Sequence, residues 1–202
     1  MITTIIFDLG GVLVRTENRT PRRLLAEKFG MTYDEMDELV YGSPTSKQAG
    51  SGMISAEEHQ ETVLKTLGLP AGSFKSFGDE FWGGDRLDKM LVDFIIGLRE
   101  EYTTALLSNA WDDLRPLLIN LWKIDGIFDH IFISAELKLA KPDPRIYQHV
   151  INELQQDPSE MIFLDDFIEN VEAARAEGLH AIHFRSREQA LGELAEYLDN
   201  EV

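Results

Sequence analysis

Carboxylates stand at the ends of two apolar segments that are far apart in the chain. Asp8 follows Ile5-Ile6-Phe7 and precedes Gly10-Gly11, and the pair Asp165-Asp166 follows the run from Met161 to Leu164. Carboxylate oxygens are the ligands that Mg²⁺ prefers, and a carboxylate can also act as a nucleophile. Like charges gathered in one place are costly without a cation. If the fold brings these groups together, phosphoryl transfer is the chemistry that suits them.

Two further segments end near residues that can bind a phosphate. Ser108-Asn109 follows the apolar run from Thr103 to Leu107, and Lys141 precedes Pro142 in a loop. A serine hydroxyl can donate a hydrogen bond to a phosphoryl oxygen, and an ammonium group can balance its charge. Each residue also has a simpler explanation, because Ser108-Asn109 could cap a helix and Lys141 could be solvated. Asn170 is expected on the surface of the helix after Asp166, or else behind the residues that contact the substrate.

The elements that must position these residues alternate along the chain. Alternation of strands and helices predicts an α/β fold with a parallel sheet that helices cover on both faces. The carboxyl ends of parallel strands meet at one edge, where such sheets bind ligands, so we expect the polar residues to form one cluster. The predicted strands are residues 2–7, 103–107, 131–133, 161–164 and 181–184, and the predicted helices are 87–98, 111–121, 144–154, 168–177 and 187–198.

The segment between the first strand and residue 84 contains only helical patterns. Thr20-Pro21 is typical of an N-cap followed by proline at the first helical position, and Ser55 with Glu58 forms a capping box. The range Gly42–Gly52 is rich in Ser, Gly and Pro and indicates a loop. We therefore expect a core of residues 1–14 and 84–202, and a small all-helical insertion of residues 15–83 directly after the first strand.

The composition excludes several partners and chemistries. The 202 residues carry a formal net charge of −17, and an acidic surface repels nucleic acids and anionic membranes. The absence of cysteine excludes disulfides, thiolate nucleophiles and Cys-bound zinc. It also fits a reducing compartment, so we expect a cytoplasmic protein. We expect no signal peptide, because the N-terminal residues lead straight into a strand without a basic flank. The expected partner is a small phosphorylated metabolite, and the expected state is a monomer or homodimer.

Four motifs resemble, in order and spacing, those of the haloacid dehalogenase superfamily. They are Asp8-Leu9-Gly10-Gly11-Val12-Leu13, Leu107-Ser108-Asn109, Lys141-Pro142-Asp143-Pro144 and Phe163-Leu164-Asp165-Asp166. Gly52-Met53-Ile54-Ser55 resembles the small helical cap of one branch, which includes a bacterial sugar-1-phosphate phosphatase and the N-terminal phosphatase domain of soluble epoxide hydrolase. The resemblance implies a Rossmann-like core under a mobile cap, with Mg²⁺ as the cofactor and an aspartate nucleophile.

Site roles follow from the residues and from this resemblance. The catalytic residues are expected to be Asp8, Ser108 and Lys141, and the substrate-binding residues Gly10, Gly11 and Asn109. Asp8 and one or both of Asp165 and Asp166 are the expected metal ligands. The resemblance adds the Gly10 carbonyl oxygen and favours Asp166, with Asp165 in support.

One position departs from the pattern. Most phosphatases that the chain resembles carry a second aspartate two residues after the nucleophile, where this chain has Gly10. That aspartate protonates the leaving group and then activates water, which is typically worth about 10²–10⁴ in rate. Three outcomes stay open: only good leaving groups are accepted, His59 or Glu57 of the cap replaces the aspartate, or phosphate is bound with little turnover. The sugar-1-phosphate phosphatase of this branch also has glycine there, which favours weak activity.

Two other functions stay open as alternatives. A 2-haloacid dehalogenase also uses an aspartate nucleophile and lacks the second aspartate. It needs no metal, however, and Asp165-Asp166 argues for one. The alternative outside catalysis is a phosphate- or partner-binding module that kept the pocket and lost turnover at Gly10.

Overall fold

A five-stranded sheet forms the centre of the structure, a computed structural model that describes residues 1–199. The strand order is β5-β4-β1-β6-β7, and all neighbouring strands are parallel. Every residue of the central strand β1 is buried, as expected for an apolar strand covered on both faces. The strands are β1 (Thr4–Phe7), β4 (Thr103–Ser108), β5 (His130–Ile133), β6 (Met161–Asp165) and β7 (His180–His183).

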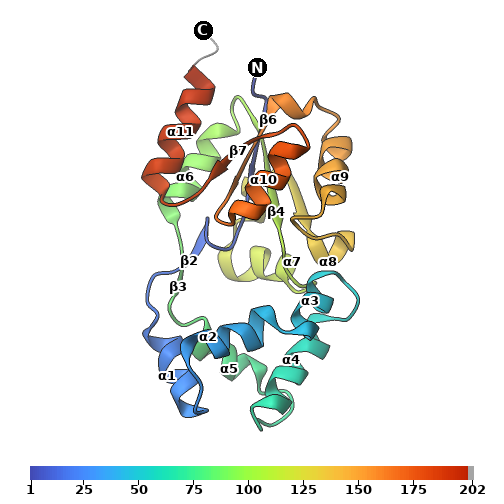
Figure 1. Cartoon of the computed structure of the whole chain (residues 1–202). Coiled ribbons are helices and arrows are strands. Elements are labelled where there is room, and N and C mark those ends of the chain that lie inside the picture. The colour runs from blue at the N-terminus through green and yellow to red at the C-terminus, as the bar shows by residue number, and fades with distance from the viewer. Residues whose placement is uncertain (200–202) are drawn as a thin grey trace.

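Helices cover both faces of this sheet, which confirms the predicted α/β fold (Figure 1). Helices α6, α7 and α11 share one apolar cluster with the sheet, and α9 and α10 share another on the opposite face. The helices are α6 (Lys89–Leu98), α7 (Leu114–Leu117), α8 (Ser134–Leu137), α9 (Pro144–Leu154), α10 (Ile168–Ala176) and α11 (Arg187–Asp199), with a π-helical segment at Leu118–Trp122 and 3₁₀ turns at Asp125–Ile127 and Pro158–Glu160. Within residues 1–199, none of the helices has the length and apolar character needed to cross a bilayer.

A second group of helices lies beyond the carboxyl ends of the strands (Figure 1). These helices enclose an apolar cluster of their own, which includes Met36, Leu64, Phe77 and Phe81. They are α1 (Thr20–Lys28), α2 (Tyr33–Asp37), α3 (Pro44–Gly50), α4 (Ala56–Thr66) and α5 (Phe74–Phe81), with a π-helical segment at Glu38–Gly42. We call them the cap; its division from the core at residues 15 and 84 stays a prediction.

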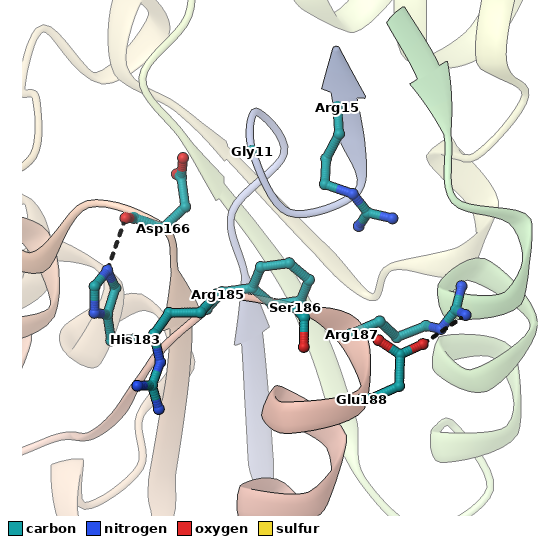
Figure 2. Close-up of a pocket in the computed structure, with 9 residues that line it drawn as sticks. Gly11, Arg15, Asp166, His183, Arg185, Ser186, Arg187 and Glu188 are labelled. Atoms are coloured by element: carbon teal, nitrogen blue, oxygen red, sulfur yellow. Dashed lines mark hydrogen bonds and ion pairs between the residues drawn. The ribbon is translucent and has the colours of Figure 1, made fainter. Parts of the chain in front are cut away.

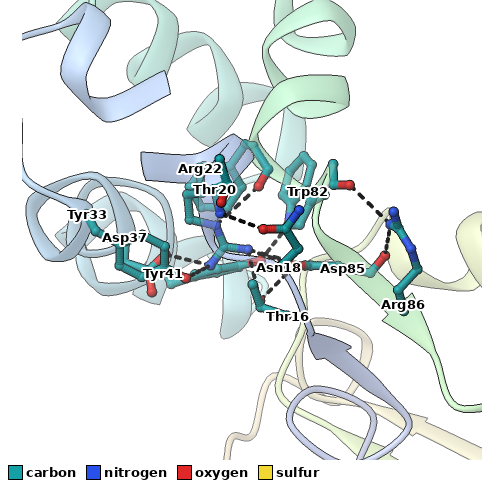
Figure 3. A network of polar contacts seen from close by, with 12 residues as sticks. Thr16, Asn18, Thr20, Arg22, Tyr33, Asp37, Tyr41, Trp82, Asp85 and Arg86 are labelled. Carbon is teal, nitrogen blue, oxygen red and sulfur yellow. Dashed lines mark hydrogen bonds and ion pairs between the residues drawn. The ribbon is translucent and has the colours of Figure 1, made fainter. Parts of the chain in front are cut away.

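The chain crosses between core and cap twice, and the two crossings pair as an antiparallel ribbon, β2 (Val14–Thr16) with β3 (Asp85–Leu87). Figure 3 shows the polar network where this ribbon meets the cap. Its centre is Arg22, which is 3% exposed. The Arg22 guanidinium lies 2.7 Å from Asp37 of the cap and 3.2 Å from Asp85 of the ribbon. Arg22 therefore ties the cap helices to the ribbon that carries them.

Three local predictions were wrong. Gly42–Gly52 is not a loop but contains α3, since the Ser43 hydroxyl accepts a hydrogen bond from the Ser46 N–H and Pro44 occupies the first turn. These capping signals were present, but the small, polar composition outweighed them. Thr20 is the first residue of α1 rather than its N-cap, which is Arg19.

The third error concerns the helix predicted over residues 111–121. The α-helix begins only at Leu114 and changes to a π-helical segment at Leu118. Residues 110–113 lie outside it; the side chains of Trp111, Asp112 and Asp113 contact the cap, as described below. The capping box of Ser55 and Glu58 at the start of α4 is confirmed.

Candidate active site

The strand register places three carboxylates together at the carboxyl edge of the sheet. Phe7 of β1 pairs with Leu164 of β6, so the residues that follow them, Asp8 and Asp165, leave neighbouring strands side by side. One oxygen from each of Asp8, Asp165 and Asp166 lies within 4.8 Å of the others. The structure thus brings together the acidic groups that the sequence placed at strand ends.

Lys141 is buried among these acids, with its side chain only 1% exposed. Its Nζ lies 2.9 Å from Asp8 Oδ1 and 2.6 Å from Asp165 Oδ2, and it donates a hydrogen bond to the Leu107 carbonyl oxygen. The explanation of Lys141 as a solvated loop residue is therefore wrong. Its ammonium group offsets part of the negative charge at the strand ends.

The side chain of Asn109 holds the backbone of Lys141 rather than pointing away from it. Asn109 Nδ2 donates to the Lys141 carbonyl oxygen at 2.8 Å, and Asn109 Oδ1 accepts from the Lys141 N–H at 2.9 Å. Both polar atoms of the amide are used in this pairing. The segment after β4 therefore positions the lysine loop.

Both oxygens of Asp165 are occupied by donors. Asp165 Oδ1 accepts from the Phe167 N–H at 2.8 Å, and Asn170 Nδ2 lies 3.0 Å from each oxygen. Asn170 is buried, so its expected place on the helix surface was wrong, and the alternative place behind the site residues agrees with its contact to Asp165. Helix α10 begins at Ile168, and Asn170 lies in its first turn. That turn follows the carboxyl end of β6, so the Asn170 side chain reaches Asp165. None of the four motifs includes Asn170. The signal in the sequence that could have indicated its contact with Asp165 is an amide side chain in the first helical turn after two aspartates.

The electrostatics of the cluster favour a bound cation. Burial raises the pKa of Asp8 to about 7. The positive charge of Lys141 acts to lower this pKa, and the negative charge of Asp165 acts to raise it. Burial and the charge of Asp165 raise the pKa of Asp166 to about 6. Asp166 Oδ1 is buried with no hydrogen-bond partner among the described residues. An orphaned oxygen among crowded carboxylates is what a hard cation such as Mg²⁺ would satisfy, so the donor set fits this metal.

The two glycines after Asp8 have different surroundings. A Cβ at Gly11 would lie 2.0 Å from Asp166 Oδ2, and the Gly11 N–H already donates to the Val14 carbonyl oxygen. Gly11 thus leaves room for Asp166. Gly10 is exposed, and a Cβ there would have no atom within 4 Å. Ser108 ends β4 at the same edge and is 4% exposed.

The geometry argues against His59 as a replacement for the missing aspartate. His59 is fully buried inside the cap. Its Nε2 lies 2.9 Å from the Val40 carbonyl oxygen and therefore carries the proton, while Nδ1 lies 2.9 Å from the Thr45 hydroxyl. Both ring nitrogens are thus engaged. Glu57 is exposed on α4.

A hollow of about 580 Å³ borders the cluster on the side of Gly11 and Asp166 (Figure 2). Three arginines line it, and each already contacts a carboxylate. Arg15 and Arg187 both contact Asp88, at 2.6 and 2.8 Å. Arg185 contacts Glu193 at 3.2 Å. The hollow therefore joins Asp166 to solvent without presenting a strong excess of positive charge.

Comparison with known proteins places this geometry in context. A family model described as haloacid dehalogenase-like hydrolase matches residues 2–178. The chain is 29% identical to bifunctional epoxide hydrolase 2 of Rattus norvegicus over 93% of its length, but it spans only 35% of that protein. It is 27% identical to the sesquiterpene phosphatase astK of Aspergillus oryzae, covering 88% of this chain and 87% of that one. It is 26% identical to a D-ribitol-5-phosphate phosphatase of Bacteroides thetaiotaomicron, covering 88% and 89%.

Solved structures match nearly the whole chain. A protein of Porphyromonas gingivalis described as a predicted HAD-like family hydrolase superimposes with a TM-score of 0.82 and 26% identity over 98% of each chain. An enzyme of the same family from Bacteroides thetaiotaomicron, solved as a magnesium complex, gives a TM-score of 0.74 and 26% identity, covering 90% of this chain and 92% of that one.

Proposed function

Because the chain belongs to the haloacid dehalogenase-like hydrolase family, we propose that it is a Mg²⁺-dependent phosphomonoester hydrolase with Asp8 as its nucleophile. One observation carries the proposal: the Lys141 ammonium group lies between Asp8 and Asp165, at 2.9 and 2.6 Å. Beside them stands an oxygen of Asp166 that has no hydrogen-bond partner within residues 1–199. Phosphatases among the relatives support the same reaction class.

The metal would be held by Asp8, the Gly10 carbonyl oxygen and Asp166. When bound, Mg²⁺ neutralises phosphate charge and so lets a carboxylate approach a dianion. Asp165 has both oxygens occupied by Lys141, Asn170 and the Phe167 N–H. We therefore assign Asp165 to supporting Lys141 rather than to direct ligation.

The reaction proceeds in two displacements at phosphorus. The ionised carboxylate of Asp8 attacks, a bond forms between its oxygen and phosphorus, and the leaving oxygen departs with the bonding electron pair. Water then attacks phosphorus, releases inorganic phosphate, regenerates the Asp8 carboxylate and gives its proton to solvent. Ser108 and Lys141 stabilise the phosphoryl oxygens by hydrogen bonding and charge. Asn109 keeps Lys141 in place through its two bonds to the lysine backbone.

Gly10 limits which esters react well. It offers no side chain to protonate the leaving oxygen, so that oxygen must depart as an anion or take its proton from water. Esters of acidic alcohols, phenols and anomeric hydroxyls meet this requirement better than esters of simple alcohols. The relatives' names span a sugar-alcohol phosphate and a sesquiterpene, so the substrate panel should include both polar and apolar phosphates.

The test measures phosphate release from p-nitrophenyl phosphate, sugar 1-phosphates, ribitol 5-phosphate and farnesyl phosphate, with Mg²⁺ and with EDTA. We expect Mg²⁺-dependent turnover that Asp8→Asn abolishes. Asp93→Asn, an exposed aspartate on α6, is the matched control and should keep full activity. Mg²⁺ should also raise the melting temperature of the wild type more than that of Asp166→Asn.

Other results would replace the proposal. Halide release from 2-chloropropionate that ignores EDTA would identify a dehalogenase. A Mg²⁺-induced rise in melting temperature without hydrolysis of any ester would identify a binding module silenced at Gly10.

A further inference from the structure

The segment after the candidate phosphate-binding residues Ser108-Asn109 contacts the cap instead of continuing as core helix. Residues 110–113 precede α7, which begins at Leu114. The β2–β3 ribbon joins core and cap on the other side of the molecule, and Figure 1 shows α3 approaching α8 away from that ribbon. The ribbon alone would let the cap swing about it, so a second attachment would determine how the cap sits over the strand ends.

Two aspartates of this segment contact helix α4 of the cap. Asp112 Oδ1 accepts a hydrogen bond of 2.8 Å from the N–H of Ala56, the first residue of α4. Asp113 Oδ2 accepts one of 2.8 Å from Gln60 Nε2, one turn further along. The first N–H groups of a helix lack partners within the helix and attract negative charge. Asp112 therefore stabilises the N-terminus of α4 in its position against the core.

Trp111, the residue before these two aspartates, also contacts the cap. It packs against the apolar cluster of the cap although it belongs to the core segment after β4. Its ring lies 4.7 Å from that of His59 and 6.3 Å from that of Tyr41, measured between centroids. His59 is thus part of the surface on which Trp111 docks.

A third contact joins the same core region to the end of α3. The Ser134 hydroxyl donates to the Gly50 carbonyl oxygen at 2.6 Å and accepts from the Ala110 N–H at 3.0 Å. Nearby, a Cβ at Gly52 would lie 2.2 Å from the Ala135 carbonyl oxygen. Cap and core backbones therefore approach closely where glycine permits it.

We propose that Trp111, Asp112 and Asp113 are positioning residues that clamp α4 of the cap to the loop carrying Ser108 and Asn109. Residues 108–113 form one continuous segment. The residues that would contact phosphate and the residues that hold the cap therefore belong to the same loop. The clamp itself is independent of the reaction; its effect on turnover rests on the proposed phosphatase function.

Hydrogen–deuterium exchange tests the clamp without any substrate. Asp112→Ala removes the acceptor for the Ala56 N–H, whereas Asp112→Asn keeps an oxygen there. We expect the first turn of α4 to exchange about five- to tenfold faster in Asp112→Ala, as for the loss of one hydrogen bond, and the asparagine variant to restore most of the protection. Unchanged exchange in Asp112→Ala, or equal acceleration in both variants, would overturn the proposal.

A double-mutant cycle of Asp113→Ala and Gln60→Ala gives a second readout from both sides of the clamp. We expect the pair to speed exchange in α4 no more than either single change, because both remove the same bond. Full additivity would count against the clamp.

The activity arm separates positioning from general damage. Asp112→Ala should raise KM for p-nitrophenyl phosphate severalfold and leave kcat within about twofold. Acetyl phosphate offers less surface for the cap to contact, so we expect its hydrolysis to stay as in the wild type. Equal losses on both substrates would refute a positioning role. If the wild type hydrolyses nothing, the proposed function fails, while the exchange experiments still decide whether the clamp exists.

Discussion

Asn170 Nδ2 lies 3.0 Å from both carboxylate oxygens of Asp165, and the same carboxylate contacts Lys141, which also contacts Asp8. Asn170 would act on the reaction through Asp165, which it orients. Loss of such an orienting group typically costs about 10- to 100-fold in activity. We expect Asn170→Ala to lower kcat/KM by this factor with the fold intact. Glu169→Gln, at an exposed neighbouring position, is the control. Equal activity of the two variants would show that Lys141 needs no such support.

Gly10→Asp should raise activity toward poor leaving groups. The new Cβ meets no atom within 4 Å, so the site can accept the side chain, and a positioned acid/base is worth about 10²–10⁴ in rate. We expect the dependence of kcat/KM on leaving-group pKa to flatten across a series of aryl and alkyl phosphates. The comparison is Gly11→Ala, whose Cβ would collide with Asp166 and which should lose activity. A steep dependence retained in Gly10→Asp would mean that protonation does not limit the reaction.

Arg22→Met should destabilise the cap strongly. The guanidinium is buried and contacts Asp37 and Asp85, and its loss leaves both acids without this partner. Breaking a buried ion pair from one side costs about 3–5 kcal/mol. Thermal unfolding should show this loss. Arg23→Met is the control, since Arg23 forms an exposed pair with Glu27 and should leave the melting temperature nearly unchanged.

The buried Asp88 predicts a pH-dependent stability. Burial acts to raise its pKa, but hydrogen bonds from Arg15, the Leu91 N–H and Arg187 outweigh burial and hold the pKa below its usual value. A carboxyl whose pKa is lower in the folded state stabilises the fold above its unfolded pKa of about 4, and this contribution is lost as pH falls through the folded pKa.

Asp88→Asn should therefore unfold more easily than the wild type at pH 7, by about 1–3 kcal/mol. The difference should shrink as pH falls below about 4, which urea unfolding across pH can measure. A constant difference from pH 7 to pH 3 would assign the loss to packing rather than to charge.

The sequence by itself determined the alternation of strands and helices, and with it the edge of the sheet where Asp8, Ser108 and Asp165 meet. Hydrophobic periodicity is a local property, and the parallel arrangement brings strand ends to one edge without further information. The positions of the four motifs, and the glycine in place of a second aspartate, followed instead from the resemblance of these segments to those of the family. Capping chemistry was harder to judge, since Ser43-Pro44 signalled a helix inside a segment whose composition indicated a loop.

Only the tertiary structure decided where the side chains point. Lys141 is buried between two acids, Asn170 is buried against Asp165, and Trp111 of the core packs against the apolar cluster of the cap. Each of these placements depends on contacts between residues distant in the chain. The spacing of residues along one segment does not indicate which other element will bury a polar group or pack against an aromatic ring. The partner of each such side chain comes from an element distant in the sequence.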